Sequence, residues 1–326
     1  MPRTTVTQLY QRLTLPVISA PMFIVSGPEL LIAQCASGII GSMPALNARP
    51  QSKLAEWLTQ IDTALAELKR REPGRIVAPY AINHIIHKSN DRLLEDLAVC
   101  ADHKVPLIIT SLRAPNDVVD AVHGWGGKVF HDVTTMRHAR KALDAGVDGL
   151  ILVCSGAGGH AGTLSPFALL AEVRKIFDGP IALSGAISRG HDVLAARAMG
   201  ADFAYIGTRF IASHEAHAQE AYKQMLVDAQ ANDILYTPFF TGIPGNYLKP
   251  SIAAAGLDPD TLASSNPDGT NFGSTRTKAW RDIWGAGQGV GSIDSISSVA
   301  TIVEKLKDEY REAYSALGDS FTGGQA

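Results

Sequence analysis

The chain has 326 residues, of which 46% are hydrophobic and 19% are charged, and its formal net charge is −3. This is the composition of a globular protein with a large core, and 29 basic against 32 acidic residues predict no nucleic-acid partner. Cys35, Cys100 and Cys154 are too far apart in sequence to predict a disulfide framework or a metal site. The absence of a long apolar run predicts no membrane span and no signal peptide, so we expect a cytoplasmic protein.

Eight short apolar runs recur along the first 208 residues, and helical patterns alternate with them. The runs are continuous rather than alternating, as is typical of parallel strands covered on both faces. The predicted strands are 16–21, 38–44, 76–85, 106–111, 128–133, 149–155, 181–186 and 203–208.

Eight strands that alternate with helices predict an α/β fold, a (β/α)8 TIM barrel. An open, doubly wound sheet is the alternative, but no GxGxxG motif opens the first strand–helix connection. After residue 212 the sequence becomes first helical and then rich in Pro, Gly, Asn, Ser and Thr. We therefore predict a barrel made of 1–212 and 280–326, with a smaller, mainly helical or loop subdomain, 213–279, inserted after the eighth strand.

Small residues end the seventh and eighth predicted strands, where a barrel carries its reactive groups. Ser184, Gly185 and Ala186 end the seventh strand. Gly207 and Thr208 end the eighth. Backbone N–H groups there can approach an anion, and the helix start that follows adds its positive end. Tight turns are the alternative for either strand alone, but two on adjacent strands favour a phosphate site.

A glycine-rich stretch after the sixth strand, "SGAGGHAG" at 155–162, carries His160. Its small residues would let a flat ligand lie against the loop beside the imidazole. Because histidine exchanges protons near neutral pH, His160 is a candidate catalytic residue, although a single histidine is more often structural or solvated. At the end of the fifth strand, Asp132 is either a ligand-binding residue or the N-cap of the following helix. The ten histidines show no spacing that predicts a metal site.

Five short motifs follow one another along the chain. They are "APM" at 20–22, "GAGGHAG" at 156–162, "SGAISRG" at 184–190, "GADFAYIGTRF" at 200–210 and "AGQGVGSI" at 286–293. In this order and spacing they resemble the nitronate monooxygenase (2-nitropropane dioxygenase-like) flavoproteins, whose relatives include NADH:quinone reductases and an FMN-dependent enoyl-acyl-carrier-protein reductase. The resemblance covers roughly 10–212 and 280–310.

The resemblance implies one FMN at the strand ends and a catalytic role for His160. Asp132 stands where some members have a lysine, so its role toward the cofactor stays open. The acidic residue that many members carry before the histidine is absent here. The implied cofactor-binding residues are Pro21, Met22, Phe23, Asn83, Asp132, Gly159, Ser184, Gly185, Ala186, Gly207, Thr208 and Gln288.

The implied activity is the oxidation of alkyl nitronates by O2 to a carbonyl compound and nitrite. His160 would hydrogen-bond the nitronate oxygens and remove the α-proton of neutral nitroalkanes. One alternative is the reduction of a quinone or an enoyl thioester by NAD(P)H on the same FMN, and another is a barrel that binds a phosphorylated metabolite without redox chemistry. The use of NAD(P)H and the formation of a homodimer stay open. Tyr236, Phe239, Phe240 and Tyr247 are either walls of the substrate site or the core of the small subdomain.

Overall fold

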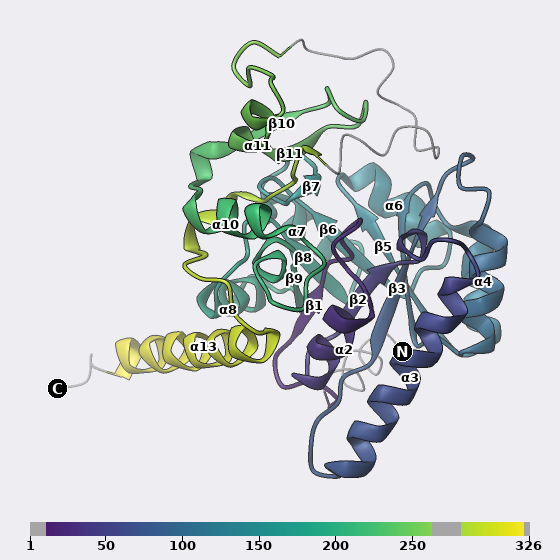
Figure 1. Ribbon diagram of the computed structural model, residues 1–326. Coiled ribbons are helices and arrows are strands. Elements are labelled where there is room, and N and C mark those ends of the chain that lie inside the picture. Colours follow the sequence, from purple (N-terminus) through teal and green to yellow (C-terminus); the bar gives the residue numbers. More distant parts are fainter. Residues whose placement is uncertain (1–10, 263–281, 323–326) are drawn as a thin grey trace.

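The computed structural model describes residues 11–262 and 282–322, and eight strands form its centre (Figure 1). Each strand overlaps one of the eight runs predicted from the sequence. The barrel strands are β1 (Val17–Ser19), β2 (Gly41–Pro44), β3 (Tyr80–Ile86), β4 (Leu107–Leu112), β5 (Lys128–Val133), β6 (Gly149–Val153), β8 (Ile181–Ser184) and β9 (Phe203–Ile206).

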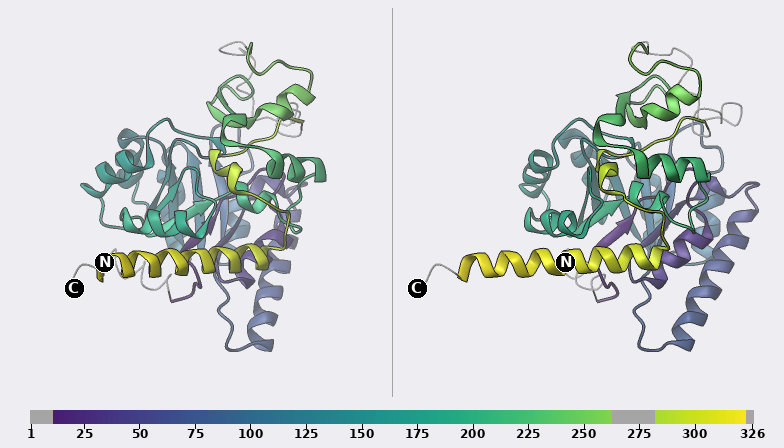
Figure 2. Two further views of the ribbon diagram at one scale, coloured as in Figure 1. Left: turned by 90° about the vertical axis from the view of Figure 1, so that its left-hand side faces the viewer. Right: turned by 60° about the vertical axis from the view of Figure 1, so that its left-hand side comes forward.

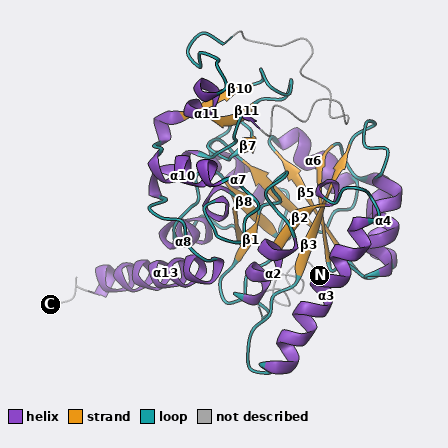
Figure 3. Ribbon diagram, in the orientation of Figure 1, coloured by secondary structure: helices purple, strands orange, loops and turns teal. Residues whose placement is uncertain are grey.

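These strands form one parallel sheet in the order β1-β9-β8-β6-β5-β4-β3-β2. A parallel bridge between Ile18 and Ile40 joins β1 to the start of β2 and closes the sheet on itself. Figure 3 shows the strands gathered inside a layer of helices. The predicted (β/α)8 barrel is therefore confirmed.

Helices cover the outer face of the barrel. Thr135 begins one of them, α6, by accepting a hydrogen bond from the His138 N–H (3.2 Å), so Asp132 is not its N-cap. The covering helices are α2 (Pro28–Ala36), α3 (Lys53–Arg71), α4 (Leu93–Asp102), α5 (Asn116–Gly124), α6 (Met136–Asp144), α7 (Pro166–Arg174) and α8 (Gly190–Ala198). The short helices η1 (Ala45–Asn47) and α9 (Thr208–Ile211) follow the carboxyl ends of β2 and β9 instead.

Strand alternation divides the buried side chains into an outer and an inner set. The outer set, which includes Ile82 and Leu150, packs against the helices. The inner set fills the barrel, where Phe130 and Phe203 lie 6.3 Å apart between ring centroids. Two residues further along the strands the inner positions become polar. This polar layer, which consists of Asn83, Ser111, Asp132, Ser184 and Tyr205, lies at the carboxyl ends of the strands, where a barrel carries its active site.

The segment after β9 forms an antiparallel hairpin that the sequence analysis did not predict. Its second strand also pairs with the two-residue strand β7 (Gly159–His160), so that Gly245 lies opposite His160. Figure 1 shows this three-stranded sheet beyond the strand ends of the barrel. The elements of the segment are α10 (Glu220–Asp228), η2 (Ala231–Asp233), β10 (Ile234–Thr237), β11 (Gly245–Leu248) and α11 (Lys249–Ala254). The domain limits stay a prediction, and 263–279 of the predicted subdomain lies outside the described residues.

The chain returns to the barrel through η3 (Gln288–Ser292), and the last described element is α13 (Val299–Thr322). This last helix packs against α8 and α2, and Figure 2 shows it extending past the barrel. At the crossing with α8, a Cβ on Gly190 would lie 2.0 Å from the Leu306 carbonyl oxygen, so only glycine allows this approach. Within the described ranges, every helix is too short or too polar to cross a membrane.

Candidate active site

A cavity of about 1450 Å³ lies at the carboxyl ends of the barrel strands. It exceeds the roughly 300–1,000 Å³ of a typical small-ligand pocket. The polar layer of the barrel forms part of its wall, and the segment after β9 contributes the opposite side. The structure brings ten predicted site residues together around it. These are Pro21, Met22, Phe23, Asn83, Asp132, Gly159, His160, Ser184, Gly207 and Thr208.

Three other predicted residues, Gly185, Ala186 and Gln288, lie beside the cavity rather than in its described lining. They gather around Gly156, whose carbonyl oxygen accepts hydrogen bonds from the N–H of Ala186 (3.3 Å) and of Gln288 (2.9 Å). A Cβ on Gly156 would lie 3.0 Å from Gln288 Oε1 and 3.3 Å from the Ala186 Cβ. These residues therefore support the loop that precedes His160.

The backbone of Ala186 lies in the left-handed region, with a φ of 56°. Such a conformation costs a residue with a Cβ about 1–2 kcal/mol, whereas glycine adopts it freely. We predict that Ala186→Gly raises the free energy of unfolding by about 1 kcal/mol after the greater entropy of unfolded glycine is subtracted. Chemical denaturation measures this directly. A destabilised variant would contradict the backbone conformation described here.

A helix start that contributes its positive end to the phosphate site stays a prediction, but at the start of α8, the helix after the seventh strand, carboxylates of the protein already occupy the backbone N–H groups. The N–H groups of Ser188 and Arg189 donate to Asp192 Oδ2 at 3.0 and 2.9 Å. The N–H of Gly190 donates to Glu309 Oε2 at 2.7 Å. Because carboxylates already satisfy these donors, the positive end of this helix is neutralised by the protein itself.

Bare backbone forms one edge of the cavity where three loops meet. A Cβ on Gly158 would lie 2.8 Å from the Gly287 nitrogen and 3.0 Å from Thr208 Oγ1. The Gly287 N–H donates to Thr208 Oγ1 at 2.9 Å, which ties this loop to the end of β9. Gly207 and Thr208 line the cavity beside Gly158. An edge without side chains allows a phosphate to approach backbone N–H groups closely.

The loop after β1 supplies Pro21, Met22 and Phe23. Asn47 holds it in place, since its Nδ2 donates to the Met22 carbonyl at 3.0 Å and its Oδ1 accepts from the Ile24 N–H at 3.0 Å. These bonds hold an apolar wall on the β1 side of the cavity.

The histidine loop is tied to the β10–β11 hairpin by several hydrogen bonds. Asn246 Nδ2 donates to the Ala157 carbonyl at 2.6 Å, and the Tyr236 hydroxyl donates to the Ala161 carbonyl at 2.9 Å. A Cβ on Gly245 would lie 2.9 Å from the Gly159 carbonyl oxygen, so this glycine permits the close strand pairing. The position of His160 is therefore set by residues more than 75 positions away in the sequence.

One hydrogen bond assigns the tautomer of His160. Its Nε2 lies 3.0 Å from Thr241 Oγ1, and the same hydroxyl donates to the Ile243 carbonyl at 3.0 Å. A carbonyl only accepts, so the Thr241 proton is committed to it and His160 Nε2–H donates to Thr241. Nδ1 is then the basic nitrogen of the ring. Burial lowers the pKa of His160 from 6.5 to about 4, so the imidazole is neutral at neutral pH.

Asp132 lies at the end of a chain of hydrogen bonds across three neighbouring strands. Asn83 Nδ2 donates to Ser111 Oγ at 2.9 Å, and Ser111 Oγ donates to Asp132 Oδ2 at 2.6 Å. The other carboxyl oxygen, Oδ1, is buried and lacks a hydrogen-bond partner within the described part of the chain. Burial raises the pKa of Asp132 from 3.8 to about 7, partly offset by the Ser111 hydrogen bond.

The aromatic residues predicted for the small subdomain divide between two roles. Tyr236 and Phe240 line the cavity, as one alternative predicted. Tyr247 is fully buried in a small cluster with Ile252, as the other alternative predicted, and its ring lies 5.0 Å from that of Phe240. Phe239 packs edge-on against Phe240 at 5.2 Å.

Several residues that line or shape the cavity could not be identified, or were not predicted, from the sequence. Thr241 has no local signal that connects it with His160. Tyr222 and Trp284 stack at 4.9 Å between ring centroids on one side of the cavity, although 62 positions separate them. Ser111 and Tyr205 could have been found, because each lies at a strand end two residues beyond a buried inner position.

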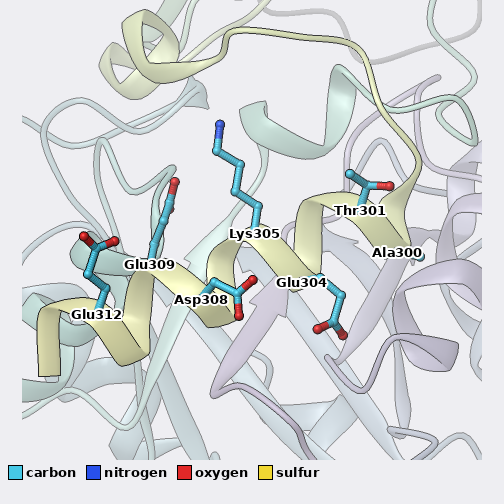
Figure 4. A pocket seen from close by; sticks show the side chains of 7 residues that line it. All are labelled: Ala300, Thr301, Glu304, Lys305, Asp308, Glu309 and Glu312. Atoms are coloured by element: carbon cyan, nitrogen blue, oxygen red, sulfur yellow. The ribbon is translucent and has the colours of Figure 1, made fainter. Parts of the chain in front are cut away.

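A second, shallow depression runs along α13 on the outside of the barrel (Figure 4). Its side chains are mostly acidic, and Lys305 pairs with Asp294 at 2.6 Å. It contains none of the predicted site residues. The residues that line it are Ala300, Thr301, Glu304, Lys305, Asp308, Glu309 and Glu312.

The closed barrel, the large cavity at its strand ends and the neutral imidazole beside it define a TIM-barrel enzyme. The family model described as nitronate monooxygenase matches residues 6–309. The chain belongs to this nitronate monooxygenase family, and the resemblance read from the five motifs is confirmed.

Individual relatives agree with this membership. A nitronate monooxygenase of Paraburkholderia phytofirmans is 26% identical over 288 residues, which are 75% of this chain and 76% of that protein. The structure of nitroalkane oxidase from Streptomyces ansochromogenes is 26% identical, with a TM-score of 0.75 over 95% of this chain and 99% of that one. A mutant of FabK from Thermotoga maritima is 25% identical, with a TM-score of 0.76 over 97% and 99%. The chain spans 66% and 76% of the length of two curated relatives that it matches.

Proposed function

We propose that this chain is an FMN-dependent nitronate monooxygenase that converts alkyl nitronates and O2 into a carbonyl compound and nitrite. Membership of a family of flavoprotein oxidoreductases and the likeness to nitroalkane oxidase support this activity. One observation carries the proposal. A neutral imidazole, that of His160, lines a cavity whose edge is bare backbone at Gly158 and Gly207.

The residues present fit an FMN. The glycine edge at Gly158 and Gly207 would hold the phosphate by backbone N–H groups, as this group requires. Pro21 and Met22 offer an apolar wall for the flat ring system. The cavity volume of about 1450 Å³ leaves room for a substrate as well. When bound, FMN accepts electrons from the nitronate and passes them to O2, which is chemistry that side chains do not supply.

His160 and its surroundings handle the proton of the substrate. Thr241 fixes the tautomer in which Nδ1 is basic, and burial keeps the ring neutral, so the base form is present across the neutral pH range. We infer that Nδ1 accepts the α-proton of a neutral nitroalkane. The imidazolium that forms would then lie beside the nitronate anion and stabilise it. Tyr236 and Phe240 would shield the site from water.

An absorbance spectrum of the purified protein, followed by anaerobic titration, tests this proposal. We expect the yellow colour of a bound flavin, the release of FMN on denaturation and loss of the visible absorbance on adding propyl nitronate. Protein that stays colourless after incubation with FMN would refute the proposal and favour the non-redox barrel that binds a phosphorylated metabolite.

Reduction of a quinone or an enoyl thioester by NAD(P)H is the second candidate function. The size of the cavity favours it, because about 1450 Å³ accommodates a second large ligand beside FMN. Rapid anaerobic loss of the flavin absorbance on mixing with NADH, with none on mixing with nitronate, would establish the reductase instead of the monooxygenase.

A further inference from the structure

The polar layer at the top of the barrel contains a directed chain of hydrogen bonds that the proposed oxidation of nitronate does not use. Asn83, Ser111 and Asp132 occupy inner positions of β3, β4 and β5, which are hydrogen-bonded neighbours in the sheet. All three line the cavity. The apolar layer beneath them, which includes Ile109 and Phe130, separates them from the other end of the barrel.

The direction of this chain is set from one end. Asn83 Nδ2 donates to the Ile109 carbonyl at 3.2 Å, which fixes the amide orientation because a carbonyl only accepts. The second Nδ2 hydrogen points to Ser111 Oγ at 2.9 Å, so the Ser111 proton must go to Asp132 Oδ2 at 2.6 Å. Oδ2 is therefore an acceptor. Any proton on Asp132 must reside on Oδ1, the buried oxygen that lacks a partner within the described residues.

We propose that Asp132 Oδ1 is a proton-exchange site coupled to the oxidation state of the cofactor in this cavity. The carboxylate takes up one proton when reduction adds negative charge to the cavity, and it releases this proton on reoxidation. Two electrons reach the FMN from the reductant, and the proton on Oδ1 comes from solvent in addition to any that the flavin itself takes up. The inference rests on the proposed binding of FMN.

The surroundings of Asp132 allow this uptake. The pKa of the carboxyl is about 7, so the protonated and charged forms differ little in free energy near neutral pH. Burial, and after it the charge of Asp132, raises the pKa of the Tyr205 phenol on β9 well above its ordinary value, so this phenol stays neutral. The other titratable groups that line the cavity are Arg49, Asp91, Arg92, His138, His160, His217, Tyr222 and Tyr236, and burial raises the pKa of both tyrosines. Burial lowers the pKa of both His138 and His160, so neither is a cation at neutral pH.

The midpoint potential of the FMN-bound protein, measured by spectroelectrochemistry from pH 6 to 9, tests the inference. Each proton taken up with two electrons adds about 30 mV per pH unit to the slope. Above about pH 7 we expect the wild-type slope to exceed that of Asp132→Asn by about this amount. Below pH 7 the two slopes should converge, because the carboxyl is already protonated before reduction.

Two further variants separate the proton site from a merely structural role. Ser111→Ala removes a hydrogen bond that favours the carboxylate, so the pH at which the slope steepens should move upward while the steep slope itself remains. Thr110→Val removes a hydroxyl that instead contacts His131 Nδ1 at 2.8 Å, and it should leave the profile unchanged.

Equal slopes in the wild type and Asp132→Asn would overturn the inference while the proposed function stood. If the pH at which the slope steepens did not move in Ser111→Ala, the inference would be overturned even if Asp132→Asn could not be obtained folded. Wild-type protein that does not bind FMN would instead refute the proposed function.

Discussion

His160→Asn is expected to lower kcat/KM for a neutral nitroalkane by about 10²–10⁴-fold while FMN stays bound, because proton removal in the transition state contributes this much. Asparagine keeps a polar side chain of similar size but cannot accept the α-proton. The same variant should lose far less activity with preformed propyl nitronate, from which the proton is already gone. Steady-state rates with the two substrates measure the difference.

His123→Asn serves as the matched control, since His123 is exposed and pairs with Asp148 at 2.8 Å outside the cavity. It should behave like the wild type. Equal losses with nitroalkane and nitronate in His160→Asn would show that the imidazole binds the substrate but does not act as its base.

The lowered pKa of His160 adds a pH criterion to this result. Since burial favours the neutral ring and brings the pKa to about 4, the base form persists as the pH falls and is lost only near that value. We therefore expect the activity that depends on His160 to change little between pH 7 and pH 5. A histidine with the ordinary pKa of about 6.5 would lose roughly 25-fold over the same range.

Gly158→Ala is expected to weaken FMN binding strongly. The new Cβ would lie 2.8 Å from the Gly287 nitrogen. Because the φ of Gly158 is not positive, this steric clash is the only obstacle to an alanine side chain at the position. The loop can relieve the contact only by moving, which displaces backbone from the phosphate. Overpacking of this kind costs about 1–3 kcal/mol, which corresponds to roughly 5- to 150-fold in the Kd for FMN.

Fluorescence titration of the apoprotein with FMN measures this change. Gly74→Ala is the matched control, because no atom lies within 4 Å of its added Cβ and the residue does not line the cavity. Unchanged affinity in Gly158→Ala would place the phosphate elsewhere on the cavity wall and would remove the glycine edge from the proposed function.

The barrel and much of the site could be predicted from short-range patterns. Continuous apolar runs such as 128–133 and 149–155 identified buried parallel strands, since both faces of such strands are covered. Strand ends then located Asn83, Asp132, Ser184 and Thr208, because parallel strands in a closed barrel bring their carboxyl ends together. The motifs around His160 predicted the family, which the match over residues 6–309 confirms.

The hairpin and the helix starts could not be predicted in the same way. β10 and β11 are four residues each and become strands by pairing with each other and with β7, a contact that local composition does not encode. At the start of α8, the Gly190 N–H donates to Glu309, which lies more than 100 residues later in the sequence, so local composition does not show that this donor is satisfied.

The sequence by itself thus determined the barrel, the order of its strands along the chain and the identity of the histidine. Periodicity, strand-end position and motif spacing are properties of neighbouring residues. Only the tertiary structure decided which ring nitrogen of His160 is basic, which oxygen of Asp132 can carry a proton and which backbone edge is bare. Each of these depends on a partner brought close by folding, such as Thr241 or Gly287, and on burial that changes the free energy of a charge.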